Sequence, residues 1–256
     1  MAVFFEAATP GDGDWAAFTD AIDVEFNHTS NGGEVCALVC AAFTASDLSL
    51  GPFVIGDNEL DDLTRRATYG GQPMTSVGVV QWSTSQAWTE VFAAFDIPAG
   101  RNQVRVKVDG GAASKRHVRA TCVTYTGVDG VGTPVSGSGT GTSMSISATA
   151  AAADRVVGVF GTKDGIGAFN QTQRTVTNAT TAMLVGDAAG TGSTMALTAT
   201  RQKSGVWGGF AVPLLAAATV ATADPLIVEP RLDAIVRREP RLGGLRRQVF
   251  TVPLED

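Results

Sequence analysis

Hydrophobic and polar residues alternate with a period of two along much of this chain. In Gln103–Val108, for example, three valines alternate with Arg105 and Lys107. That pattern is typical of an antiparallel β-strand that buries one face. Comparable runs predict further strands at Val3–Ala7, Ala21–Asn27, Glu34–Phe43, Val77–Trp82, Thr89–Ile97, Val118–Thr126, Ser143–Thr149, Arg155–Gly161, Arg174–Asn178, Ala182–Gly186, Ser193–Thr200 and Gly205–Leu214.

Short turn sequences separate these runs. They include Asn31-Gly32-Gly33, Tyr69-Gly70-Gly71, Pro98-Ala99-Gly100, Asp109-Gly110-Gly111 and Asp129-Gly130. Many short strands at fairly regular spacing, without long helices between them, indicate sheets packed face to face. We therefore predict an all-β fold, an antiparallel β-sandwich of jelly-roll type.

Two segments depart from the strand pattern. Asp57–Arg66 is the best helix candidate, because Asp57 or Asn58 can cap it and its leucines lie three residues apart. Gly137–Ser143 consists of glycine, serine and threonine alone, which predicts a loop or linker and would allow a subdivision of the body. It resembles a phosphate-binding loop only superficially, because no lysine follows and it leads into a predicted strand.

The last part of the chain has a different composition. Pro225, Pro230, Pro240 and Pro253 are too closely spaced for a helix or a central strand. The sequence Glu-Pro-Arg-Leu occurs twice, ending at Leu232 and again at Leu242. We therefore divide the chain into a β body, residues 1–223, and an extended C-terminal arm, residues 224–256.

The arm is too apolar for a solvated tail, yet it cannot form a core of its own. An extended segment of this kind can add to the sheet edge of a neighbouring subunit and place side chains in pockets. The alternative is an arm that folds back onto its own body. The candidate partner-binding residues are Leu226, Ile227, Val228, Leu232, Ile235, Val236, Leu242, Leu245, Phe250 and Leu254.

Composition and charge support a globular body with a sizeable core. Hydrophobic residues make up 44% of the 256 residues, and charged residues make up 17%. No Lys or Arg precedes Arg65, whereas acidic residues run from Glu6 to Asp62. This imbalance can be neutralised within one fold, or it can give subunits complementary faces. The absence of a dense basic patch argues against nucleic-acid binding.

The sequence offers little for catalysis, metals or cofactors. His28 and His117 have no carboxylate, Ser or Cys partner at an informative spacing, so we expect both at the surface or at strand edges. The acidic clusters Asp12/Asp14 and Asp57–Asp62 do not match a calcium-binding loop. We predict a protein that is not an enzyme and has no metal or cofactor.

The cysteines and the apolar segments point to a protein made in the cytoplasm. On a strand, Cys36 and Cys40 would lie about 13 Å apart, too far for a disulfide, so these two and Cys122 are expected to be buried free thiols. Met1–Phe5 lacks the features of a signal peptide. Val212–Ala223 is shorter than a membrane-spanning helix, so we expect no membrane insertion.

The aromatic residues leave two interpretations open. Trp15, Trp82, Trp88 and Trp207 would offer stacking platforms for sugars if they were exposed. They would fill the core if they were buried, as large aromatic side chains normally do.

Several stretches of the body, in order along the chain, resemble β-sandwich virion proteins of tailed bacteriophages, especially minor tail proteins of phages that infect actinobacteria. These stretches are Tyr69–Met74, Trp88 to Gly100, Val104–Val106, Ala120–Asp129 and Val156–Phe160. An excess of Arg over Lys and the abundance of Ala, Gly and Thr suit a GC-rich host. The resemblance spans about residues 1–215 and does not include the arm.

This resemblance implies a structural protein of the virion that contacts other virion proteins and copies of itself. Its place on the particle stays open between a minor tail protein and a capsid decoration or head–tail connector protein. A receptor- or carbohydrate-binding module of the tail tip, with a host-surface glycan as its ligand, is an alternative of another class. A glycan-degrading enzyme is the least favoured, because no catalytic residues stand out.

Overall fold

The computed structural model describes residues 1–11, 15–16, 21–45, 65–83, 87–109, 116–179 and 181–218. These residues contain strands and turns and no helix, so the predicted all-β class is confirmed. The strands are β1 (Phe4–Gly11), β2 (Trp15–Ala16), β3 (Ala21–Ser30), β4 (Val35–Ala45), β5 (Arg65–Tyr69), β6 (Gln72–Pro73), β7 (Thr75–Ser83), β8 (Ala87–Ala94), β9 (Gly100–Asp109), β10 (Arg116–Thr126), β11 (Val128–Val131), β12 (Val135–Thr149), β13 (Arg155–Thr162), β14 (Ile166–Phe169), β15 (Thr172–Thr177), β16 (Ala182–Ala189) and β17 (Thr194–Ala216).

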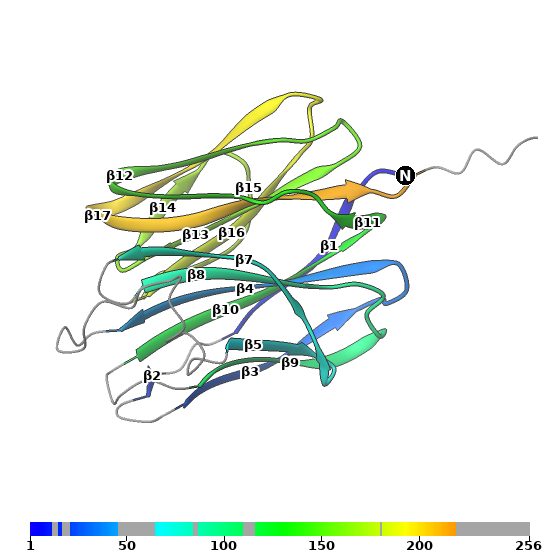
Figure 1. Cartoon of the computed structure of the whole chain (residues 1–256), viewed down its shortest axis with the longest axis horizontal. Coiled ribbons are helices and arrows are strands. Elements are labelled where there is room, and N and C mark those ends of the chain that lie inside the picture. The colour runs from blue at the N-terminus through cyan, green and yellow to red at the C-terminus, as the bar shows by residue number, and fades with distance from the viewer. Residues whose placement is uncertain are drawn as a thin grey trace, which may run out of the picture. The chain divides into compact units, whose positions relative to one another are not determined.

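The strands form three antiparallel sheets. The central sheet has the order β1-β10-β4-β8-β7, with β2 beside β10. The small sheet has the order β3-β9-β5-β6. The third sheet has the order β11-β17-β13-β16-β15, and β12 and β14 also pair with β17. Figure 1 shows the sheets as successive layers of strands, all of which belong to one compact unit, Met1–Thr219.

The central sheet is buried on both faces, because side chains of a strand point alternately to opposite sides. In β4, Val39 and Phe43 belong to a first hydrophobic cluster, which they share with residues of the small sheet. Leu38 and Cys40 belong to a second cluster, which they share with residues of the third sheet. Burial on both faces explains why the sequence of β4 is an almost continuous apolar run.

A third hydrophobic cluster lies on the other face of the third sheet. The long strands β12 and β17 pair along nearly their whole lengths, with an irregularity in the register between Gly141 and Ser143. The C-terminal half of β17 also pairs with β13. In the other half of the β12–β17 pair, Ile146 and Leu197 belong to the same hydrophobic cluster as Phe160 of β13. The third sheet therefore covers part of its own outer face.

The prediction of a loop at Gly137–Ser143 is wrong. This segment lies inside β12 and pairs with β17, so no linker interrupts the body at this point. Its glycines leave room for large neighbours, since a Cβ atom on Gly139 would lie 3.1 Å from the indole nitrogen of Trp207. The small residues of this segment therefore fit a strand that lies against Trp207 of β17.

Two other predictions change at their boundaries. The strands predicted at Ser193–Thr200 and Gly205–Leu214 are one strand, β17. The helix predicted at Asp57–Arg66 is wrong at its end, because Arg65 and Arg66 pair with β9 as part of β5. The remainder of that segment lies outside the described residues.

Within the part of the chain that the structure describes, no helical segment qualifies as a membrane span.

Candidate functional site: a groove at the free edge of the central sheet

The ten predicted partner-binding residues of the arm, from Leu226 to Leu254, lie outside the described residues. The acidic clusters Asp12/Asp14 and Asp57–Asp62 also lie outside them. Among the described residues of the body, no three or more His, Cys, Asp or Glu side chains are grouped so that they could hold a metal ion.

A large open groove of about 590 Å³ lies on the body. It is mainly apolar and is lined by Tyr69, Gln72, Pro73, Thr75, Ser76, Val77, Ala93, Ala94, Phe95, Asp96, Ile97, Pro98, Val131, Gly132 and Pro134. These residues come from the β5–β6 hairpin, the start of β7, the end of β8 with the connection to β9, and the end of β11 with the connection to β12. The groove thus lies where parts of all three sheets meet.

One wall of the groove is a free sheet edge. β7 is the last strand of the central sheet and pairs with β8 on one side, without a described strand on the other. Thr75 and Ser76, at its start, are exposed and line the groove. A free edge beside an apolar hollow is the arrangement that binds an extended peptide, because backbone groups pair while side chains enter pockets.

An acidic depression of about 280 Å³ adjoins the groove and shares Phe95 and Asp96 with it. Glu34 and Asp129 add two further carboxylates, and all three acidic side chains are exposed. The other lining residues have uncharged side chains. The N-terminal ammonium group of Met1 donates to the Ala217 carbonyl at this wall, 2.7 Å away, and one positive charge leaves the depression acidic. The depression therefore favours a further cationic group.

Phe95 joins the two hollows. Its side chain is 42% exposed, and it lines both the groove and the acidic depression. It thus forms an apolar rim between a surface that suits aliphatic side chains and a surface that suits a cation.

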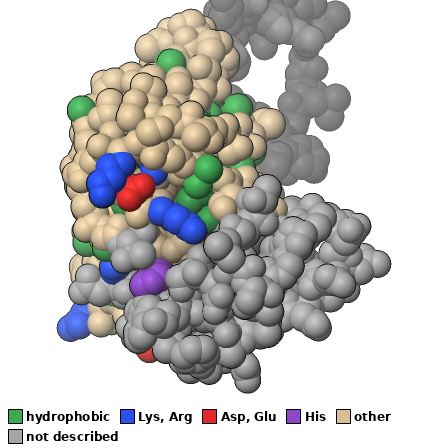
Figure 2. Space-filling view, turned by 90° about the vertical axis from the view of Figure 1, so that its left-hand side faces the viewer, with side chains coloured by type: hydrophobic (Ala, Val, Ile, Leu, Met, Phe, Trp, Pro, Cys, Tyr) green, Lys and Arg blue, Asp and Glu red, His purple; other side chains and the backbone are tan. Residues whose placement is uncertain are grey.

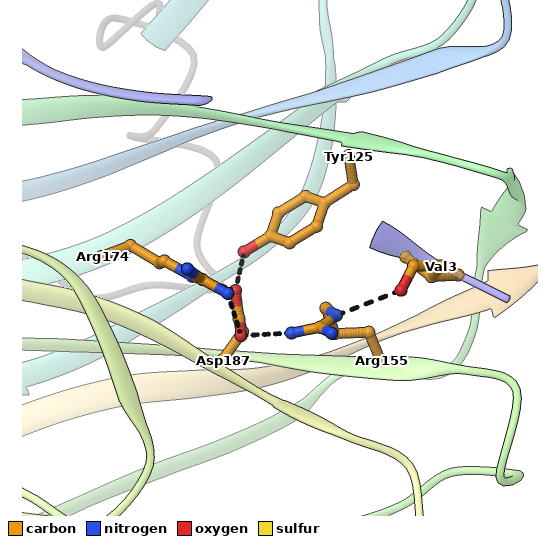
Figure 3. Close-up of polar contacts among 5 residues, drawn as sticks. All are labelled: Val3, Tyr125, Arg155, Arg174 and Asp187. Carbon is orange, nitrogen blue, oxygen red and sulfur yellow. Dashed lines mark hydrogen bonds and ion pairs between the residues drawn. The ribbon is translucent and has the colours of Figure 1, made fainter. Parts of the chain in front are cut away.

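A buried polar network joins the central sheet, and Val3 just before β1, to the third sheet (Figure 3). Asp187 of β16 is fully buried and accepts hydrogen bonds from the hydroxyl of Tyr125, at 2.9 Å, and from Arg174 Nε, at 2.7 Å. Arg155 Nη1 donates to the other carboxylate oxygen at 2.5 Å, and Arg155 Nε donates to the Val3 carbonyl at 3.3 Å.

This network is saturated by its own members. Burial, followed by the nearby Asp187 carboxylate, raises the pKa of Tyr125 well above its usual value, so the phenol stays protonated and donates its hydrogen bond. The guanidinium of Arg174 also lies 3.8 Å from the centre of the Phe5 ring. Both carboxylate oxygens accept hydrogen bonds from protein donors, so the arrangement joins the layers of the body.

The prediction of a surface position is wrong for His28. Its side chain is 1% exposed, and its ring nitrogens lie 2.8 Å from Thr9 Oγ1 and 3.1 Å from Thr124 Oγ1. Burial lowers the pKa of His28, although the negative charge of Glu6 opposes this shift. The neutral imidazole therefore joins β3 to β1 and β10, because its two nitrogens match hydroxyls that can donate or accept.

The three cysteines are free and buried. Cys36 and Cys40 face the second cluster, whereas Cys122 faces the first cluster across the central sheet. Burial raises the pKa of Cys36 to about 12 and raises the pKa values of the other two thiols as well. Protonated thiols in apolar surroundings are poor nucleophiles, so these residues pack the core.

The described tryptophan side chains are also core residues. Trp82, Trp88 and Trp207 are 5–6% exposed. Trp88 stacks on Phe43 with ring centres 3.9 Å apart, and the indole nitrogen of Trp82 donates to Thr89 at 3.1 Å. None of the three offers an open face to a sugar, and the side chain of Trp15 is outside the described part.

Part of the charge imbalance along the chain is neutralised internally. Arg105 of β9 pairs with Asp23 and Glu25 of the neighbouring strand β3. Figure 2 shows one face of the molecule, on which charged side chains of the described residues are few and opposite charges lie close together. The acidic depression differs from this surface because its lining residues include three carboxylates and neither Lys nor Arg.

Sequence reasoning missed both the groove and the Asp187 network. The groove combines residues from four separate segments, each of which is an ordinary turn or strand end in sequence. Asp187 does leave a signal, since it is the one charged residue in the apolar strand β16, and a lone carboxylate in a buried strand needs a partner.

Comparisons of the chain with protein-family models, curated proteins and solved structures find no match.

Proposed function

We propose that this chain is a structural virion protein of a tailed bacteriophage, a minor tail protein that assembles through its β body and its C-terminal arm. The sequence resemblance described above suggests the class. The observation that carries the proposal is the combination of a layered body whose described tryptophan side chains are internal with an apolar groove left open at a free sheet edge. Such a body is suited to holding a partner.

The face-to-face packing of the sheets supports the β-sandwich class within this proposal. The first and second clusters each join the central sheet to a different neighbour, so the sandwich has more than two layers. The jelly-roll form stays a prediction.

The proposed protein is not an enzyme and uses no cofactor. The buried polar groups best suited to catalysis, Asp187 and His28, are engaged by neighbouring protein groups. Its partners are other virion proteins and copies of itself, without nucleic acid and without membrane insertion. The site of action is the virion, after synthesis in the host cytoplasm.

A capsid decoration or head–tail connector protein would have the same kind of body and arm. Labelling intact particles with an antibody against the body, followed by electron microscopy, separates these positions. Label on the tail is expected, whereas label on the capsid or at the neck would assign the protein to the alternative.

A receptor- or carbohydrate-binding module is the second candidate because of one hollow in the third sheet. This hollow, of about 400 Å³, is lined by Ser143, Ser145 and Thr200 beside the half-buried ring of Phe169. Hydroxyl groups beside an aromatic ring can bind a sugar. Binding to host-surface glycans that is lost in Phe169→Ala, with the melting profile unchanged, would favour this function over the first.

The arm's contribution to assembly is tested by Leu232→Asp combined with Leu242→Asp in the full chain. Burying one leucine contributes about 1.5–3 kcal/mol, so two charged replacements should abolish docking. We expect a folded protein that fails to join the particle. Leu232→Met with Leu242→Met is the control, and it should join normally. Normal incorporation of the double aspartate variant would contradict the proposal.

A further inference from the structure

We propose that the groove and the adjoining acidic depression form the docking site for the C-terminal arm of a second copy of this chain. This inference rests on the proposed function and names the site at which the arm would act. The site consists of the free edge at Thr75–Val77, the apolar rim at Phe95, and the carboxylates of Glu34, Asp96 and Asp129.

The chemistry of the two hollows matches the repeated sequence of the arm. In Glu-Pro-Arg-Leu, a leucine follows directly after an arginine, at Arg231 and again at Arg241. Adjacent side chains of an extended segment point to opposite sides. A leucine placed in the apolar groove therefore leaves its arginine outside the groove, from where the long side chain can reach the carboxylates of the adjoining depression. Proline cannot donate a backbone hydrogen bond, so it suits an edge strand rather than a central one.

The position at which the arm begins favours a second copy over the same chain. Ala217, near the end of the described chain, lines the acidic depression. Leu232 follows fifteen residues later, a stretch that spans up to about 50 Å when extended. Pro225 and Pro230 stiffen this stretch, which would have to turn back sharply to reach the groove beside its own starting point. A reach of that length allows the repeats to meet the groove of a second copy.

Charge-reversal variants of the full chain test this pairing. The body variant is Glu34→Arg with Asp129→Arg, the arm variant is Arg231→Asp with Arg241→Asp, and the third variant combines all four changes. Sedimentation velocity at low and high salt measures self-association. We expect each pair of changes alone to weaken self-association at least about tenfold, and the combined variant to recover most of it.

The design separates a specific contact from general charge effects. The body variant and the arm variant shift the net charge of −6 in opposite directions, so a general effect would change their association in opposite senses. The matched apolar pair is Phe95→Ser at the rim and Val176→Ser on β15, which is 36% exposed and lines neither hollow. Phe95→Ser should weaken association, and Val176→Ser should not. The proposed docking site would be contradicted if the two serine variants weakened self-association equally, or if the combined charge variant did not recover self-association.

Cross-linking identifies the occupant. Two differently tagged full-length chains, one with Asp129→Cys and one with Arg231→Cys, are mixed and treated with a short bis-maleimide, to which the native buried thiols are unreactive. A covalent heterodimer is expected, and Val176→Cys in place of Asp129→Cys should give none. A chain that carries both cysteines and cross-links only within itself would show that the arm returns to its own body, contrary to the inference.

The outcomes also separate this site from the proposed function. If no cross-link forms at the groove while the Leu232→Asp/Leu242→Asp variant still fails to join particles, the arm acts elsewhere and only the docking site is wrong. If the cross-link forms while that variant joins particles normally, self-docking is real and the proposed role in assembly is wrong.

Discussion

β4 and β7 belong to the same sheet, yet they differ in what surrounds them. In β4, every residue from Val35 to Thr44 is buried, and both faces pack against neighbouring sheets. In β7, only Trp82 is buried, and the start of the strand borders an apolar groove. The interior of the central sheet is covered on both faces, whereas at its edge no described strand pairs with the outer side of β7 and an apolar groove lies beside it. The first region sustains the fold, and the second is suited to association.

The largest difference in stability between interior and surface is expected for Asp187, the buried carboxylate that joins the layers. Asp187→Ala leaves two arginines and a tyrosine without their shared acceptor, and removing one partner of a buried pair costs about 3–5 kcal/mol. Urea unfolding should show this loss. Asp23→Ala, which breaks a partly exposed ion pair, should cost less than about 1 kcal/mol. Similar losses in both variants would remove the distinction between interior and surface.

Leucine truncation compares the two kinds of environment directly. Leu38→Ala creates a cavity in the second cluster, so the free energy of unfolding should fall by about 2–5 kcal/mol. Leu215→Ala removes the same atoms from a side chain that is 40% exposed, and its loss should be clearly smaller. Thermal or chemical unfolding of both variants provides the measurement. An equal loss would mean that Leu215 is covered in the folded body.

The glycines provide a third comparison. Gly139→Val places a branched side chain against the indole of Trp207, and overpacking of this kind costs about 1–3 kcal/mol. A Cβ atom on Gly130 would meet nothing within 4 Å, so Gly130→Ala should be tolerated. Unfolding midpoints distinguish the two. An unchanged unfolding midpoint in Gly139→Val would indicate that the small residues of β12 are not needed for packing on Trp207.

Acid should weaken the interior through His28. Its pKa is lower in the folded protein than in the unfolded chain, so the unfolded chain binds more protons below about pH 6.5. The stability contributed by the neutral ring is therefore complete above that pH. It is lost as the pH falls, by at most about 1.4 kcal/mol per pH unit. His28→Gln should remove this dependence when unfolding is measured between pH 8 and pH 5.

A second histidine, His117, provides a control for the pH experiment. Burial and the neighbouring Arg119 also lower the pKa of the half-buried His117. His117→Gln therefore reports how much of the acid sensitivity belongs to that residue. Unchanged acid sensitivity in His28→Gln would show that its hydroxyl partners accommodate the protonated ring.

The sequence predicts the strands better than it predicts the contacts between them. Period-two patterns locate most strands, and the apolar run Glu34–Phe43 locates β4, although the burial of both faces of that strand was not predicted. The glycine-rich part of β12 is mispredicted, because its preference for a strand comes from Trp207, which is distant in sequence. His28 is misplaced for a similar reason, since its threonine partners lie on β1 and β10. The groove could not be predicted, because it depends on how three sheets meet.

The central claim is that the body is complete without the arm, which acts in docking. A chain that ends at Ala223 tests it most directly, through thermal unfolding and incorporation into phage particles measured on the same preparation. We predict cooperative unfolding within about 4 °C of the full chain, a shift that corresponds to roughly 1 kcal/mol, together with loss of incorporation. Unfolding of the shortened chain would show that the arm belongs to the body's own core, and normal incorporation would show that the arm is not used for docking.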